Sequence, residues 1–216
     1  MYRYYTTNPK ICRQFPANSR IKRRIAVNHP TMDQTLKYET CFQCCNSLAS
    51  LGLARAIRPL LLKTYVRPII LCVGSDRVAG DSLGPIVGTM LKERHLPVFL
   101  YGTLSSPVTA HEVAYVREFL TCTHPLSPVI AVDAAVGTRE DIGLIKYRAE
   151  ALLPGSGANK RLGAVGDASI LGIVAEKEKG FSALENTRLH LVREMAEAIA
   201  EALTLALTEH AALTIR

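Results

Sequence analysis

The sequence has no tryptophan, and aromatic residues make up only 6% of its 216 residues. This composition does not indicate the aromatic platforms on which proteins stack single-stranded bases. No apolar run approaches the ~20 residues that a membrane-spanning helix needs, so no membrane span is predicted. With 48% hydrophobic and 21% charged residues, the chain has an ordinary globular composition and is long enough for one α/β domain with a real core.

Acidic residues are absent from residues 1–32, which hold seven of the 26 Lys and Arg residues. The other 19 basic residues are balanced by 19 acidic residues that all lie in 33–216. The net charge of +7 therefore belongs to a basic tail, taken as 1–33, and the domain offers no nucleic-acid face. The tail is a transit peptide, a flexible arm for anionic partners, or a non-native extension before Met32.

The six cysteines do not form a recognisable metal-binding pattern. Cys41, Cys44 and Cys45 lie in CFQCC, whose C-x-x-C spacing is half of a zinc site. No second C-x-x-C or H-x-x-x-H completes it. We therefore expect reduced thiols in a cytoplasmic protein, where disulfides are rare, and no cofactor or metal.

Short apolar segments alternate with helical patterns after a weakly helical lead-in at 34–66, which Pro59 should kink or break. We predict strands and helices in this order: strand 67–74, helix 82–94, strand 97–102, helix 107–120, strand 128–134, strands 142–149 and 168–175, and one long helix 182–209. The β-α-β-α-β series favours a mostly parallel, twisted sheet in a three-layer α/β/α sandwich. The single domain is predicted to span 67–210.

Two aspartates are the strongest candidates for chemistry, because open parallel sheets bind ligands beyond the carboxyl ends of their strands. Asp81 lies in GSDRVAGDSLGP (74–85), after the first strand, and Asp133 ends the third. Two carboxyl groups at one crevice raise each other's pKa and can act as acid and base on a water molecule. Asp81 could instead cap the following helix, and Asp76, beside Arg77, fits a local turn or salt bridge.

Polar and glycine residues after the other strands are candidates for substrate binding. Gly102 and Thr103 follow the second strand. The Gly-rich loop 154–167 contributes Gly155, Ser156, Gly157, Asn159 and Lys160. A Ser–Lys nucleophile in this loop is a further alternative. Neither the phosphate-loop motif nor the dinucleotide fingerprint occurs in these turns.

Six blocks together resemble the YyaC-type sporulation proteins of endospore-forming bacteria. They are GSDRVAGDSLGP, YGTLSSPVTA, VIAVDA, PGSGANK, VGDASILGIV and LENTRLHLV, in this order, over about 67–200. A more distant likeness to the spore germination protease involves its D-A-L-G-P block, I-D-A strand end and P-G-S-G loop. The resemblance implies the fold of the hydrogenase-maturation endopeptidases, and it places the germination protease's catalytic aspartate pair at Asp81 and Asp133.

The resemblance implies a sporulation-associated peptidase or hydrolase acting on a protein or peptide substrate. Asp81 and Asp133 would activate water, and Lys160 or backbone N–H groups of the PGSG loop would stabilise an oxyanion. The alternative is a non-catalytic sporulation or spore-associated binding protein on the same scaffold. A metal-dependent maturation endopeptidase fits less well, because that family's downstream histidine ligand has no counterpart between Asp133 and His190. The expected location is the cytoplasm of the sporulating cell or the spore, and the sequence leaves a homo-oligomer open.

Overall fold

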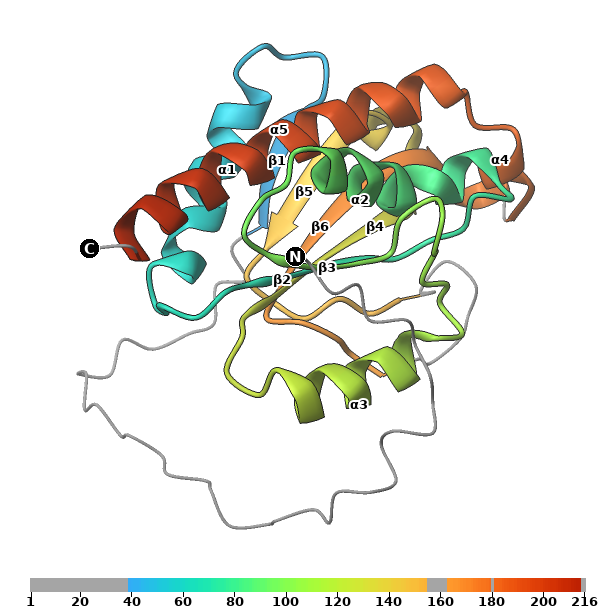
Figure 1. Ribbon diagram of the computed structural model, residues 1–216. Helices are drawn as coiled ribbons and strands as arrows, with labels where there is room; N and C mark the ends of the chain where they lie inside the picture. The colour runs from blue at the N-terminus through green and yellow to red at the C-terminus, as the bar shows by residue number, and fades with distance from the viewer. Residues whose placement is uncertain (1–38, 155–162, 180, 215–216) are drawn as a thin grey trace, which may run out of the picture.

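The computed structural model describes residues 39–154, 163–179 and 181–214, which form a six-stranded sheet with helices on both faces (Figure 1). The strands are β1 (Glu39–Gln43), β2 (Ile69–Cys72), β3 (Phe99–Tyr101), β4 (Val129–Gly137), β5 (Leu144–Arg148) and β6 (Ala168–Glu176). The helices are α1 (Ala49–Leu61), α2 (Leu83–Glu93), α3 (Val113–Thr123), α4 (Phe181–Glu185) and α5 (Leu189–Thr214), with short 3-10 helices η2 (Ala79–Ser82), η3 (Arg139–Asp141) and η5 (Lys177–Lys179). The predicted α/β fold with a mostly parallel sheet between helical layers is confirmed.

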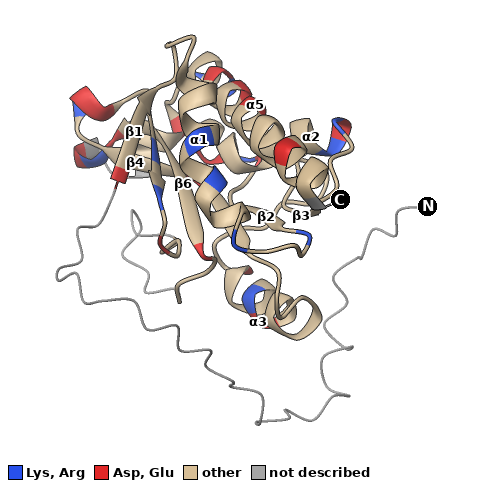
Figure 2. Ribbon diagram, turned by 90° about the vertical axis from the view of Figure 1, so that its left-hand side faces the viewer, with Lys and Arg blue, Asp and Glu red and all other residues tan. Residues whose placement is uncertain are grey.

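The strand order is β1-β5-β6-β4-β2-β3, and the pairs β6–β4, β4–β2 and β2–β3 are parallel. β5 pairs antiparallel with both β1 and β6. All residues of β2, IILC, are buried, as expected for a parallel strand covered on both faces. β2 and β3 carry no charged residue, and Figure 2 shows the charges mainly on helices, connecting loops and the β1–β5 end of the sheet.

Two hydrophobic cores hold the sheet between its helical layers. Helices α1, α2 and α5 cover one face, and α3 covers the other (Figure 1). α5 contributes the fully buried Ile199 and Leu203 to the first core, and α3 contributes Val116 and Leu120 to the second. Because β2 and β4 are covered on both faces, their carboxyl ends are held in a defined position. None of the described helices, α5 included, has an apolar stretch long enough to cross a membrane.

The prediction of a helical lead-in at 34–66 is wrong for residues 39–43, which form β1 and pair with β5. This strand has little apolar alternation, because its residues are mostly exposed at the sheet edge. The predicted break at Pro59 is also wrong, since α1 continues through it to Leu61. Pro59 lies in the exposed part of the last turn, while Ile57 and Leu61 hold the buried side of the helix in the core.

Two predicted helix boundaries are wrong. The helix expected at 107–120 begins only at Val113, because Val108 instead forms a parallel bridge with Val73. The long helix expected at 182–209 is divided into α4 and α5. At this division the side chains of Asn186 and Thr187 donate hydrogen bonds to carbonyl groups four residues earlier, an alternative to continued helical bonding.

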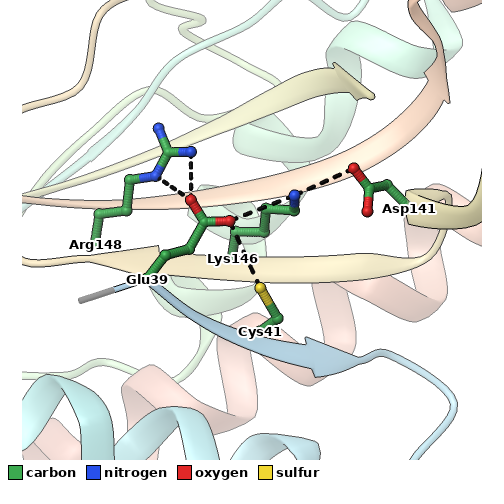
Figure 3. A network of polar contacts seen from close by, with 5 residues as sticks. All are labelled: Glu39, Cys41, Asp141, Lys146 and Arg148. Atoms are coloured by element: carbon green, nitrogen blue, oxygen red, sulfur yellow. Dashed lines mark hydrogen bonds and ion pairs between the residues drawn. The ribbon is translucent and has the colours of Figure 1, made fainter. Parts of the chain in front are cut away.

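Charged residues link the β1 edge to β5 (Figure 3). Glu39 accepts a hydrogen bond from Arg148 Nε at 2.6 Å and lies 3.4 Å from Lys146 Nζ. Lys146 Nζ also bonds Asp141 at 3.2 Å, and the Cys41 thiol donates to Glu39 at 3.6 Å. Burial raises the pKa of Glu39, but the hydrogen bonds and charges of Arg148 and Lys146 outweigh this effect and lower it below its ordinary value.

We expect Glu39→Gln to cost about 1 kcal/mol of unfolding free energy at pH 7, because partly exposed ion pairs are individually weak. A lowered carboxyl pKa stabilises the fold above the unfolded pKa, and this contribution is lost as pH falls through the folded pKa. The difference between variant and wild type should therefore shrink at pH 3 in urea titrations. The control is Glu118→Gln, which removes an exposed charge from α3. A Glu39→Gln deficit that persists unchanged at pH 3 would contradict this account.

Candidate active site

The candidate site lies where β2 ends and its neighbour β4 continues. β2 pairs with β4 up to Cys72 and Val132, and the Val73 N–H donates to the Val132 carbonyl oxygen at 2.8 Å. Beyond that point β4 continues to Gly137, paired among the described strands with β6 alone. The prediction that Asp133 ends this strand is therefore wrong: Asp133 lies in the middle of β4, as its first residue past the end of β2.

The carboxyl group of Asp133 accepts a backbone hydrogen bond that a longer β2 would otherwise accept. Its Oδ1 accepts the backbone N–H of the next residue, Ala134, at 2.9 Å. Asp133 is 8% exposed and therefore buried, and this hydrogen bond satisfies one of its carboxyl oxygens. Among the described residues no cationic side chain contributes to the pKa of Asp133, and a buried carboxyl group without such a partner is expected to hold its proton.

A closed turn carries Asp81 back toward the end of β2. The Ser75 N–H donates to the Asp81 carbonyl oxygen at 3.0 Å, and the Asp81 N–H donates to the Val78 carbonyl oxygen at 3.0 Å. Gly74 has a φ of 142°, and a Cβ added to it would overlap the Asp81 carbonyl oxygen. Glycine is therefore required at this position, where the turn passes directly over its own start.

The alternative that Asp81 caps the following helix is wrong. The N-cap of α2 is Ser82, and neither η2 nor α2 has a side-chain capping hydrogen bond. The Ser82 hydroxyl donates to the Ala79 carbonyl oxygen at 2.7 Å. Asp76 is exposed in the same turn, whereas Asp81 is half-buried. The Asp81 carboxyl group is thus not committed to holding a helix end.

Burial raises the pKa of Asp81 to about 6, although the Ser75 N–H lowers it in part. Burial, and next the charge of Asp81, raise the pKa of Asp133 well above its ordinary value, against the opposing effect of the Ala134 N–H. The two carboxyl groups therefore ionise in a fixed order. Because the charge of Asp81 raises the pKa of Asp133, ionisation of Asp81 favours a protonated Asp133, and the pair holds one proton after the first ionisation.

These raised pKa values predict that the aspartates destabilise the fold at neutral pH. A carboxyl group whose folded pKa lies above its unfolded value contributes stability at low pH, and loses it as pH rises through the folded pKa. Asp81→Asn should therefore gain stability relative to wild type between pH 4 and pH 7, measured as the urea midpoint. Asp76→Asn, in the exposed part of the turn, controls for the lost charge. A gain that does not depend on pH would refute the assignment.

Gly102 and Thr103 lie past the end of β3, at the same edge of the sheet. Gly102 has a φ of 86°, and a Cβ there would overlap the Cys72 carbonyl oxygen. Thr103 is buried, its hydroxyl lies 3.1 Å from that of Ser105, and its backbone bonds that of Ser106. Both residues thus build the turn, and their contact with substrate stays a prediction. The other predicted binding residues lie outside the described residues: Gly155, Ser156, Gly157, Asn159 and Lys160.

Sequence patterns did not reveal how the backbone assembles the site. The Ser75 N–H closes the turn, and Val108 accepts the Gly74 N–H at 2.9 Å, so the segment after β3 supports the turn after β2. A glycine-rich strand-to-helix turn was the only available signal. Backbone bonds of this kind are independent of side-chain type, and therefore leave little trace in one sequence.

Two surface hollows lie away from the aspartates. One, of about 650 Å³, is lined by residues that include Cys44, Cys45, Glu194 and Glu197. Burial, and next the charge of Glu194, raise the pKa of the Cys44 thiol, so it is not activated as a nucleophile. The other hollow, of about 540 Å³, lies on α3. Among the described residues, no three His, Cys, Asp or Glu side chains are placed to hold a metal ion.

Comparison with known proteins identifies relatives without an assigned activity. A family model described as "Protein of unknown function (DUF1256)" matches residues 43–202. A protein of Bacillus subtilis (strain 168) named "Uncharacterized protein YyaC" is 43% identical over 150 residues, which cover 67% of this chain and 72% of the relative. The predicted likeness to YyaC-type proteins is confirmed. Neither description states an activity, so the relationship to the germination protease stays a prediction.

Proposed function

This chain belongs to the DUF1256 family, and from its candidate site we propose that it is a peptidase in which Asp81 and Asp133 activate a water molecule. The observation that carries the proposal is a pair of carboxyl groups just past the end of β2, Asp133 on the neighbouring strand β4 and Asp81 in η2, which packs against β4, both with raised pKa values. Perturbed carboxyl pairs of this kind are typical of acid–base catalysis. The absence of a capping bond from Asp81 leaves its carboxylate available for this role.

The order of ionisation assigns the roles. Asp81, as the carboxylate, removes a proton from water, and the resulting hydroxide attacks the carbonyl carbon of the scissile peptide bond. Asp133, protonated, donates its proton to the departing amine nitrogen as the C–N bond breaks. Asp81 then holds the proton taken from water and Asp133 is ionised, and proton exchange with solvent restores the starting state. Lys160 and the PGSG backbone remain the predicted oxyanion stabilisers.

The proposal is tested by incubating the purified full-length protein with small spore proteins and with casein, and by identifying new peptide termini by mass spectrometry. We expect kcat/KM to rise with pH through about 6 as Asp81 ionises, and to fall at higher pH as Asp133 loses its proton. No cleavage of either substrate across pH 4 to 9, by protein shown to be folded, would refute the peptidase assignment.

A non-catalytic binding protein on the same scaffold is favoured by a different observation. Asp133 is 8% exposed, and the two hollows described above do not include either aspartate. This function predicts stable complexes with spore proteins and no new peptide termini, with the same affinity for Asp81→Asn as for wild type. The sporulation setting and the cytoplasmic location rest on the resemblance of the six sequence blocks.

A further inference from the structure

Past Asp133, β4 has an edge that no other described strand covers. Successive residues of a strand direct their backbone N–H and C=O groups to opposite neighbours. Val132 directs its carbonyl toward β2, where Val73 donates to it. Ala134 and Val136 therefore direct their backbone groups to that same side, on which β2 has already ended.

The irregularity in the β4–β6 ladder does not change this alternation. Between Ala135 and Val136 the pairing shifts from Ile173 to Ala175, so the extra residue, Val174, belongs to β6. Consistent with this, Val132, Ala134 and Val136 contact the same hydrophobic core. All residues of 134–137 are partly exposed.

The chemistry of this edge suits an extended backbone. The Ala134 N–H is turned to the carboxyl group of Asp133. The Ala134 C=O and the Val136 N–H follow as an acceptor and a donor at the spacing of a β-strand. The side chains here, in the sequence AAVG (134–137), carry no charge. In contrast, the outer edge strand β1 carries Glu39 in its ion-pair network (Figure 3), and charged side chains are a common means of discouraging strand addition.

We propose that the substrate is an extended polypeptide segment that adds as a strand to this edge of β4. The proposal rests on the proposed peptidase function and specifies its substrate class as unfolded or extended chain. An added strand would lie beyond the end of β2, beside Asp133. Because η2 packs against β4, the same strand would also pass close to Asp81. Recognition through the main chain is tolerant of sequence, since the peptide backbone supplies most of the bonds.

The test uses the full-length Asp81→Asn variant, ¹⁵N-labelled, so that binding is observed without turnover. The probe is a mixture of random-sequence decapeptides, and the matched control is the same mixture N-methylated at every residue, which removes the N–H groups along both edges of the peptide. Amide hydrogen exchange of Val136 is measured by NMR. At saturation we expect at least about tenfold slower exchange with the first mixture and no change with the second. The amides of β1 at the opposite edge serve as an internal control.

Three results would overturn the proposal: equal protection by both mixtures, binding without slower exchange at Val136, and no binding at about 1 mM peptide. Failure of the peptidase function is seen separately, in the cleavage assay with wild-type protein. Cleavage that depends on Asp81, without protection of Val136, would support the peptidase function and refute peptide binding at the β4 edge. Protection of Val136 without any cleavage by wild type would support peptide binding at the β4 edge and refute the peptidase function.

Discussion

Asp81→Asn is expected to lower the rate of peptide hydrolysis by on the order of 10³-fold, because it removes the general base while it preserves the shape of the side chain. Asparagine cannot accept the proton of the attacking water. The loss should appear in kcat, with KM changed by less than about threefold, because peptide binding is proposed to use the β4 edge. Steady-state cleavage of a fluorogenic peptide derived from the first identified cleavage site provides the measurement.

Asp76→Asn is the matched control for this experiment. It removes the same charge from the same turn, but Asp76 is exposed whereas Asp81 is half-buried. We expect its kcat/KM to stay within about twofold of wild type. Equal losses in the two variants would show that the turn needs negative charge in general. Full activity in Asp81→Asn would remove Asp81 from the mechanism.

Gly102→Ala is expected to cost about 3 kcal/mol or more of unfolding free energy. Two effects add at this position: a side chain is strained at a φ of 86°, and the new Cβ would overlap the Cys72 carbonyl oxygen at the end of β2. The backbone must shift to relieve the overlap, which disturbs the strand end that supports the site. Urea denaturation followed by circular dichroism measures the change.

Gly143→Ala separates the two effects. Gly143 also has a left-handed backbone, with a φ of 93°, but its added Cβ would meet only the Gln43 side chain at 3.3 Å and the Cys44 sulfur at 3.7 Å. We expect a loss of about 1 kcal/mol, from backbone strain alone. If the two variants lose equal unfolding free energy, the overlap with the Cys72 carbonyl oxygen does not account for the loss in Gly102→Ala. A stable Gly102→Ala variant that fails to bind peptide would instead support the predicted binding role of Gly102.

The elements that the sequence predicted well are those with a strong local signal. RPIILCVG (67–74) indicated a buried parallel strand because it is short, apolar and bounded by proline and glycine, and β2 lies there. β1 was missed because an exposed edge strand has no buried face to show in its pattern. The division between α4 and α5 was missed because Asn186 and Thr187 interrupt the helix through side-chain bonds that helical periodicity does not record.

The sequence by itself determined the α/β class and the order of the central elements, and it predicted Asp81 and Asp133 as the candidate pair. These follow from local apolar patterns and from the rule that the carboxyl ends of parallel strands share one edge. Only the tertiary structure decided that Asp81 does not cap its helix, that Asp133 is buried, and that their pKa values are raised in a fixed order. It also decided that β4 extends beyond the end of β2. Burial and strand length relative to a neighbour depend on residues far apart in the chain, and no local pattern records them.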